Sequence, residues 1–153
     1  MFVDFAEVSV ISGNGGNGAV TFRREKYVPK GGPSGGNGGK GGDVVIEAHH
    51  NLSTLLDFRY KRNYKAKNGE PGGSSLKDGK NGDDTIIKVP VGTVIKDAET
   101  GKILFDLDAD QKKVIIARGG KGGKGNSNFA TSTNQAPRFA EPGRQGEEKN
   151  IIL

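Results

Sequence analysis

Lysine and arginine side chains set among glycines are the residues of this sequence with the clearest chemical potential. The candidates for binding a polyanion are Lys30, Lys40, Lys77, Lys80, Lys121, Lys124, Arg138 and Arg144. Cations of this kind bind phosphates, and bare glycine backbone adds N–H donors and permits close approach to a crowded surface. The sequence therefore suggests RNA as a partner. The alternative is that these charges only keep a surface of low hydrophobicity soluble.

Glycine-rich loops also bind nucleotides when their glycines have the spacing of a phosphate-binding motif. The spacing GxGxxG begins at Gly13, Gly36 and Gly120, but the first copy is followed by AVTFRREKY, which has a strand pattern. A dinucleotide fingerprint requires a helix at that point. No Gly-Lys pair has a glycine five residues before it, and none is followed by Ser or Thr, as a Walker A loop requires. We therefore expect no catalytic residue and no cofactor-binding residue in this chain.

Metal-ligand patterns are equally weak. His49 and His50 are adjacent, so in a strand they point to opposite faces, and the chain has no cysteine. Asp106, Asp108 and Asp110 have the spacing that begins a calcium loop, but the downstream glycine and glutamate are missing. We expect no metal site.

The elements that position the cations follow from glycine spacing. Residues 31–42 read GGPSGGNGGKGG, and residues 119–125 read GGKGGKG, both with glycines three apart. Period three is the repeat of a polyproline-II-type helix, and glycine on its faces lets other backbones pack against it. The glycines expected to have this structural role are Gly32, Gly35, Gly36, Gly38, Gly39, Gly41, Gly42, Gly119, Gly120, Gly122, Gly123 and Gly125. An out-and-back path of twelve residues reaches roughly 20 Å.

Between the glycine clusters the sequence alternates in the manner of strands, and no long helix is predicted. A length of 153 residues and a net charge of +5 suit one soluble, slightly basic domain. No signal sequence or membrane span is visible, so we expect a cytoplasmic protein with no membrane partner. The predicted fold is all-β, with a compact sandwich- or barrel-like base and a long protrusion of packed left-handed helices. The base takes about 2–12, 19–28, 43–67, 84–117 and 147–153, and the protrusion about 13–18, 29–42, 68–83 and 118–146.

Three motifs in this order resemble the N-terminal domain of the Obg GTPases. They are FVDFAEVSVISGNGGNGAVTFRREKYVPKGGPSGGNGGKGGDV from Phe2, VPVGTVI at 89–95 and ARGGKGGKGN at 117–126. The resemblance covers essentially the whole chain. It implies the Obg fold, a small β base that carries glycine-rich helices, and in the family a Ras-like GTPase domain follows. We expect that domain after residue 153, so that this chain is an excised domain.

The resemblance further implies a role in large-ribosomal-subunit assembly. The glycine-rich protrusion would enter an rRNA-lined site near the peptidyl-transferase region, with the large subunit and its rRNA as partners. GTP, Mg²⁺ and the hydrolase activity would belong to the missing GTPase domain, not to this fragment. The alternative is a protein-interaction domain that docks on its own GTPase domain or on stress-response partners. We expect the isolated domain to be monomeric.

Overall fold

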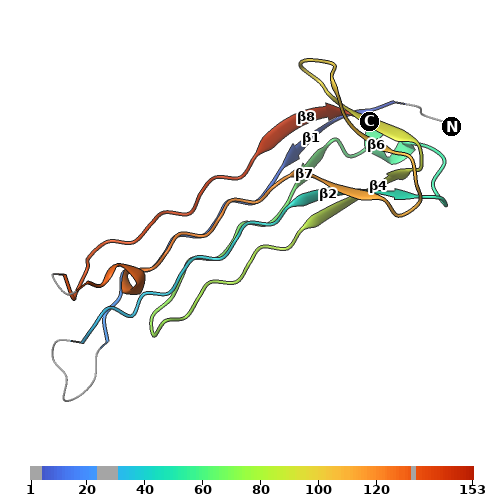
Figure 1. Cartoon of the computed structure of the whole chain (residues 1–153). Coiled ribbons are helices and arrows are strands. Elements are labelled where there is room, and N and C mark those ends of the chain that lie inside the picture. The colour runs from blue at the N-terminus through green and yellow to red at the C-terminus, as the bar shows by residue number, and fades with distance from the viewer. Residues whose placement is uncertain (1–4, 24–30, 132–133) are drawn as a thin grey trace.

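The protein consists of a small β base and a long glycine-rich arm, as Figure 1 shows for a computed structural model. The structure describes residues 5–23, 31–131 and 134–153. Within these residues the regular elements are strands and two short 3₁₀ turns, so the all-β prediction is confirmed. The strands are β1 (Glu7–Ile11), β2 (Val44–His49), β3 (Asn63–Lys65), β4 (Thr85–Pro90), β5 (Thr93–Asp97), β6 (Ile103–Leu107), β7 (Lys113–Ala117) and β8 (Glu148–Ile152). The 3₁₀ turns are η1 (Leu56–Arg59) and η2 (Asn126–Phe129).

The strands form two mixed sheets. The larger has the order β3-β1-β8-β5-β6, and the smaller has the order β4-β2-β7. Two pairs are parallel, β1 with β3 and β2 with β4, and the other paired strands are antiparallel. Each parallel pair is joined by a crossover that contains one excursion into the arm, because parallel neighbours need a long connection.

The hydrophobic core lies between the two sheets. Alternate residues of β1 and β2, among them Val8, Val10, Val44 and Ile46, are fully buried, as period two requires. Ile151 of β8 joins them from the middle of the larger sheet. All of this apolar packing belongs to the base, so the arm must be held together in another way.

Strand β6 differs from its predicted pattern. Strict alternation predicts Ile103, Phe105 and Leu107 inward and Leu104 outward. Leu107 is buried, but Ile103 is 65% exposed and Phe105 is 38% exposed, and Leu104 packs against the core. The ladder with β5 shifts register between Ile95 and Lys96, so that it skips Leu104 and places Ile103 opposite exposed Lys96. This irregularity breaks the alternation, in a strand that is also the edge of the larger sheet.

The segment predicted as a base strand over 19–28 is also different. Its described part, 19–23, belongs to neither sheet and forms only an isolated bridge between Phe22 and Pro33. The N–H of Ala19 donates to the carbonyl of Gly36 at 3.0 Å, which places the segment in the arm. The alternation of Val20 and Phe22 predicts a strand of the base, which residues 19–23 do not form. Residues 24–28 lie outside the described part of the chain.

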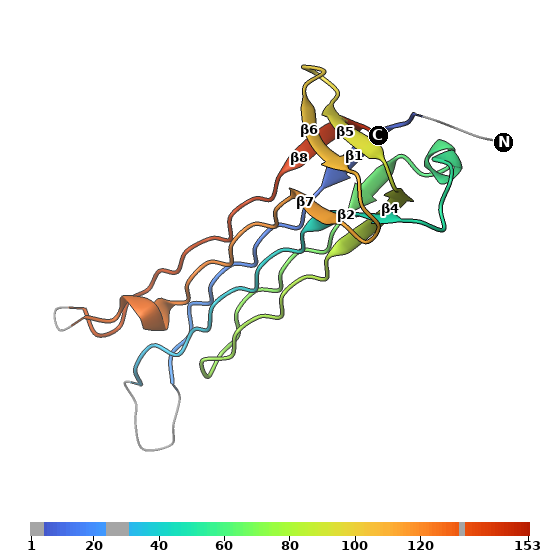
Figure 2. The same ribbon diagram turned by 45° about the vertical axis from the view of Figure 1, so that its right-hand side comes forward.

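We call the glycine-rich chains that leave the sheets the arm. Three excursions form it, and Figures 1 and 2 show their outgoing and returning chains running side by side. The first excursion lies between the other two in both views. The chains are 13–20 and 31–42 in the first excursion, 67–73 and 77–84 in the second, and 118–126 and 137–147 in the third.

Candidate nucleic-acid interface on the glycine-rich arm

Backbone hydrogen bonds with a period of three residues hold the arm together. In the first excursion the N–H groups of Gly13 and Gly16 donate to the carbonyls of Gly42 and Gly39, at 2.9 and 2.8 Å. The same period joins the excursions, since the N–H groups of Gly38 and Gly41 donate to Gly123 and Gly120 of the third. The excursions are therefore packed chains and not independent loops. Their polyproline-II conformation stays a prediction.

Glycine is required where these chains touch. A Cβ atom added at Gly38 would overlap the carbonyl of Gly16, and one at Gly122 would overlap the carbonyl of Gly38. The same overlap with a neighbouring backbone carbonyl occurs at Gly35, Gly36, Gly39, Gly41, Gly42, Gly119, Gly120, Gly123 and Gly125. Gly32 differs, because a Cβ there would meet nothing within 4 Å. Close packing thus accounts for the expected structural glycines except Gly32.

Further glycines have the same role and were missing from the predicted set. A Cβ would overlap a backbone carbonyl at Gly13, Gly15, Gly16, Gly18, Gly69, Gly72, Gly79, Gly82 and Gly143. The signal was present in the sequence, because these residues also recur three apart within their clusters.

Asparagine and aspartate side chains between the glycines supply a second set of acceptors. The Oδ1 atoms of Asn14 and Asn17 accept from the N–H groups of Gly146 and Gly143, both at 2.8 Å. Asn37 likewise accepts from the N–H of Gly125 at 2.9 Å. No local sequence pattern indicates these contacts, because they join residues that are distant in the chain. The side-chain acceptors satisfy N–H groups that the period-three backbone pattern leaves over.

Asp43 ties two excursions together where the arm joins the base. Its Oδ1 atom accepts from Lys40 Nζ at 2.6 Å and from the N–H of Gly119 at 2.7 Å. Partial burial alone would raise the pKa of Asp43, but these two hydrogen bonds outweigh it and the pKa lies below the usual value. The carboxylate is therefore charged at neutral pH. Because Lys40 forms an ion pair with it, Lys40 is less available to bind a phosphate.

The other predicted cations lie further along the arm. Lys77 and Lys80 are exposed on the second excursion, and the third excursion carries exposed Lys121, Lys124, Arg138 and Arg144. The backbone N–H of Arg144 donates to the carbonyl of Lys121 at 2.9 Å, so these two cations lie at the same level of the arm. Lys30 lies outside the described residues. The structure thus distributes the predicted cations over the arm instead of gathering them at one point.

The two outer flanks of the arm differ in charge. We define the second flank as residues 67–84 and the third flank as residues 118–147. The second flank has three lysines and four carboxylates, and the third flank has five cations and two carboxylates. Lys67 of the second flank lies 3.8 Å from the Asp83 carboxylate, which reduces its free charge. The third flank is the cationic side of the arm.

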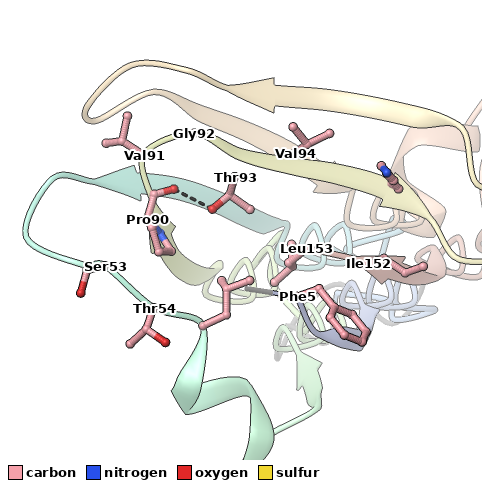
Figure 3. Close-up of a pocket in the computed structure, with 12 residues that line it drawn as sticks. Phe5, Ser53, Thr54, Pro90, Val91, Gly92, Thr93, Val94, Ile152 and Leu153 are labelled. Carbon is pink, nitrogen blue, oxygen red and sulfur yellow. Dashed lines mark hydrogen bonds between the residues drawn. The ribbon is translucent and has the colours of Figure 1, made fainter. Parts of the chain in front are cut away.

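A separate pocket of about 420 Å³ lies in the base beside Leu153 (Figure 3). Its lining includes Phe5, residues 90–94 and Ile152, and the hydroxyl of Thr93 donates to the carbonyl of Pro90 at 2.7 Å across one wall. Lys96 is the one ionisable side chain of the lining. With no acid, histidine or cysteine among its lining residues, the pocket offers no pair of groups for acid–base or nucleophilic chemistry.

Ligands of a metal ion are not gathered in the structure. Among residues 5–23, 31–131 and 134–153, no group of three or more His, Asp or Glu side chains is placed to hold a metal. In the same residues, no helix has both the length and the apolar character needed to cross a membrane.

A sequence model of the family described as GTP1/OBG matches residues 3–153, nearly the whole chain. The chain belongs to the GTP1/OBG family. This confirms the resemblance to Obg proteins that the glycine motifs indicated. The period-three arm and the two-sheet base are therefore the structure of a GTP1/OBG family member.

Curated relatives of this GTP1/OBG chain carry the name GTPase Obg. The protein of Caldicellulosiruptor bescii is 63% identical over 153 residues, which is 100% of this chain and 36% of the relative. That of Persephonella marina is 62% identical over 99% of this chain and 45% of the relative, and that of Aquifex aeolicus is 59% identical over 99% and 44%. The chain thus spans less than half the length of these relatives.

Proposed function

We propose that this chain is the ribosome-binding module of an Obg GTPase that acts in large-ribosomal-subunit assembly. In this proposal the arm inserts into an rRNA-lined site near the peptidyl-transferase region. The observation that carries it is the cationic third flank on an arm built of packed backbone. GTP hydrolysis with Mg²⁺ is assigned to another part of the polypeptide, in a cytoplasmic protein.

The packing of the arm supports insertion between RNA strands. Because glycines occupy the close backbone contacts between chains, these chains approach as closely as backbone allows, and Figures 1 and 2 show an arm that is thin for its length. A thin arm can enter a crevice that an ordinary domain with a side-chain core cannot. Apart from Lys40 and Lys67, which pair with Asp43 and Asp83, the exposed lysines and arginines of the arm do not belong to a core and can meet phosphates.

The spacing of the third-flank cations supports a phosphate track. Arg118, Lys121 and Lys124 recur every three residues, a distance of roughly 9 Å in an extended chain of this period. Arg144 lies beside Lys121 through the backbone hydrogen bond described above. The third flank thus presents a line of positive charge along the arm, whereas the second flank interrupts its lysines with carboxylates. We propose that the third flank faces the RNA.

The test compares two triple variants of equal charge change. The first replaces Lys121, Lys124 and Arg144 by Gln, and the second replaces Lys67, Lys77 and Lys80 by Gln. Binding to purified large subunits is measured across a salt series. The third-flank variant is expected to lose at least tenfold in affinity, with a log–log salt slope smaller by about 2, because each phosphate contact contributes about 0.7–0.9 to the slope. The second-flank variant is expected to stay within about threefold of the wild type.

Two results would count against the proposal. Failure of the wild-type chain to bind large subunits at low salt would overturn the ribosomal role. Equal losses in both variants would show that RNA contacts the arm without preference for the third flank.

The pocket beside Leu153 favours a second candidate function. Phe5 at its rim is 68% exposed and Val91 is 38% exposed, so apolar surface surrounds it. Because the GTPase Obg relatives are more than twice as long as this chain, we propose as the alternative that this surface docks on the GTPase domain of the same polypeptide. Pull-down of a relative's isolated GTPase domain that weakens with Phe5→Ser, while ribosome binding is absent, would favour this alternative.

A further inference from the structure

The far end of the third flank carries an aromatic pair whose role is not explained by packing of the arm. The rings of Phe129 and Phe139 lie with their centroids 4.8 Å apart and their planes at 44°. Phe129 is half-buried, whereas Phe139 is 52% exposed. An aromatic side chain that only anchored the loop would be expected to bury most of its surface.

Buried residues next to the two phenylalanines fix the backbone that carries them. Asn126, at the start of η2, is completely buried, and its Nδ2 atom donates to the carbonyls of Thr21 and Pro137, both at 3.0 Å. Its Oδ1 atom accepts from the N–H of Gly35 at 2.8 Å. These bonds join the loop to both chains of the first excursion. Pro137 is buried two residues before Phe139, so the backbone that carries the ring is fixed.

The chemical setting of Phe139 suits nucleic acid better than protein. Exposed Arg138 precedes it directly, and the same flank carries Lys124 and Arg144 nearer the base. Exposed aromatic rings among cations are typical of surfaces that bind unpaired nucleotides, where the ring stacks on a base and the cations meet the phosphates. A protein-binding surface would be expected to surround the ring with further apolar side chains.

We propose that Phe139 stacks on an unpaired RNA base. This inference rests on the ribosomal role proposed above and adds a base contact to the phosphate contacts of the third flank. Phe129 packs against the Phe139 ring and limits its motion, which lowers the entropy that stacking would cost.

The chain contains no tryptophan, which gives a direct test. Phe139→Trp places a single fluorophore at the site, and its emission is expected to be strongly quenched when large subunits, or a short unstructured RNA oligonucleotide, are added. The matched control is Leu76→Trp at the turn of the second excursion, where Leu76 is 53% exposed. That tryptophan is expected to change its emission by far less.

Affinity gives the second readout. Phe139→Ala and Phe139→Leu are expected to weaken binding roughly 5- to 150-fold, the range for loss of one base stack, whereas Phe139→Tyr stays within about threefold. Leu76→Ala should leave affinity within twofold. Amide hydrogen exchange at Gly35 shows whether the loop keeps its structure in each variant, so that misfolding is separated from a lost contact.

The outcomes separate this inference from the function on which it rests. Absence of wild-type binding to large subunits would overturn the function itself. Full wild-type binding with unchanged affinity of Phe139→Ala and an unquenched Phe139→Trp would overturn stacking alone. Weakened Phe139→Ala together with fully active Phe139→Leu would also overturn stacking, since it would assign Phe139 to an apolar contact with a protein.

Discussion

Gly38 lies in the arm between two other chains, where a side chain would meet the backbone of one of them. Its added Cβ would overlap the carbonyl of Gly16, and Gly122 of the third excursion in turn would overlap the carbonyl of Gly38. A backbone carbonyl cannot swing away as a flexible side chain can, so the chains themselves must move apart. Not every glycine of the arm is required for packing, because a Cβ atom at Gly32 would meet nothing within 4 Å.

We therefore predict that Gly38→Ala loosens the arm by about 1–3 kcal/mol and leaves the base intact. Amide exchange at Gly16, Gly39 and Gly41 should accelerate, while exchange at Val8 and Ile46 stays slow. Gly32→Ala is the control, because it adds the same methyl group where nothing lies within 4 Å. Equal effects of the two substitutions would contradict the packing explanation.

Residue roles were only partly predictable from the sequence. The period-three glycines are visible in the chain. The composition around Lys40 predicts a cation available to a polyanion, whereas its Nζ lies 2.6 Å from Asp43. A three-residue repeat puts residues i and i+3 on the same side of the chain, so the spacing of Lys40 and Asp43 indicates their ion pair. The acceptor role of Asn37 had none, since its partner Gly125 is 88 residues away. Contact of the cations with RNA stays a prediction.

At the scale of elements, the junction of arm and base depends on Asp43. Residues 31–42 lead directly into β2, and Asp43 stands between them. Its carboxylate links this chain to the start of the third excursion at Gly119. Protonation of the Asp43 carboxylate would weaken this hydrogen bond and remove the ion pair with Lys40. The junction should therefore respond to acid.

The pH prediction follows from the lowered pKa of Asp43. A carboxyl group with a depressed folded-state pKa stabilises the fold above its unfolded value, about 3.8, and loses that effect as the pH falls through the folded value. Asp43→Asn should therefore unfold at lower urea than the wild type at pH 7, with the difference shrinking between pH 4 and pH 2. Lys40→Gln removes the other partner of the ion pair, so it should cause part of the same loss of stability towards urea at pH 7. A difference that is the same at pH 7 and pH 3 would refute the assignment.

Strand existence was predictable at this scale, and strand neighbours were not. Alternation within residues 2–12 and the nearly continuous apolar run DVVIEA at 43–48 are visible in the sequence, and they predict β1 and β2. The pairing of β1 with β8 brings Val8 opposite Ile151, residues from the two ends of the described chain, and no local pattern indicates it. The exposed Ile103 shows the same limit, since nothing in 103–107 indicates the register shift with β5 that places Ile103 opposite Lys96.

At the scale of the whole molecule, the base and the arm depend on each other unequally. In the described part of the chain the hydrophobic core cluster belongs to the base, and the chains of the arm hold one another by backbone and amide hydrogen bonds. The base fixes where these chains start and return, because strands such as β2 and β7 continue directly into them. Damage to the base should reach the arm, whereas damage to the arm should stay local.

Ile46→Ala tests that inequality. Ile46 is fully buried in β2, the central strand of the smaller sheet, so the substitution should cost about 2–5 kcal/mol. Amide protection should fall together at Val8 in the base and at Gly39 in the arm. Ile86→Ala, at a position 54% exposed on β4, is the control and should change neither. Arm protection that survives in Ile46→Ala would show that the arm is stable without its base.

The central position of β8 has a consequence for the order in which the protein can fold during its own synthesis. This strand joins β1 to β5, yet it is the last of the eight to leave the ribosome. Until residue 152 emerges, the larger sheet exists only as two separate pieces, and chain 137–147 has no anchored return. The smaller sheet, complete at residue 117, and the first two excursions can form before that point. The larger sheet and the third excursion can close only once the last strand has emerged.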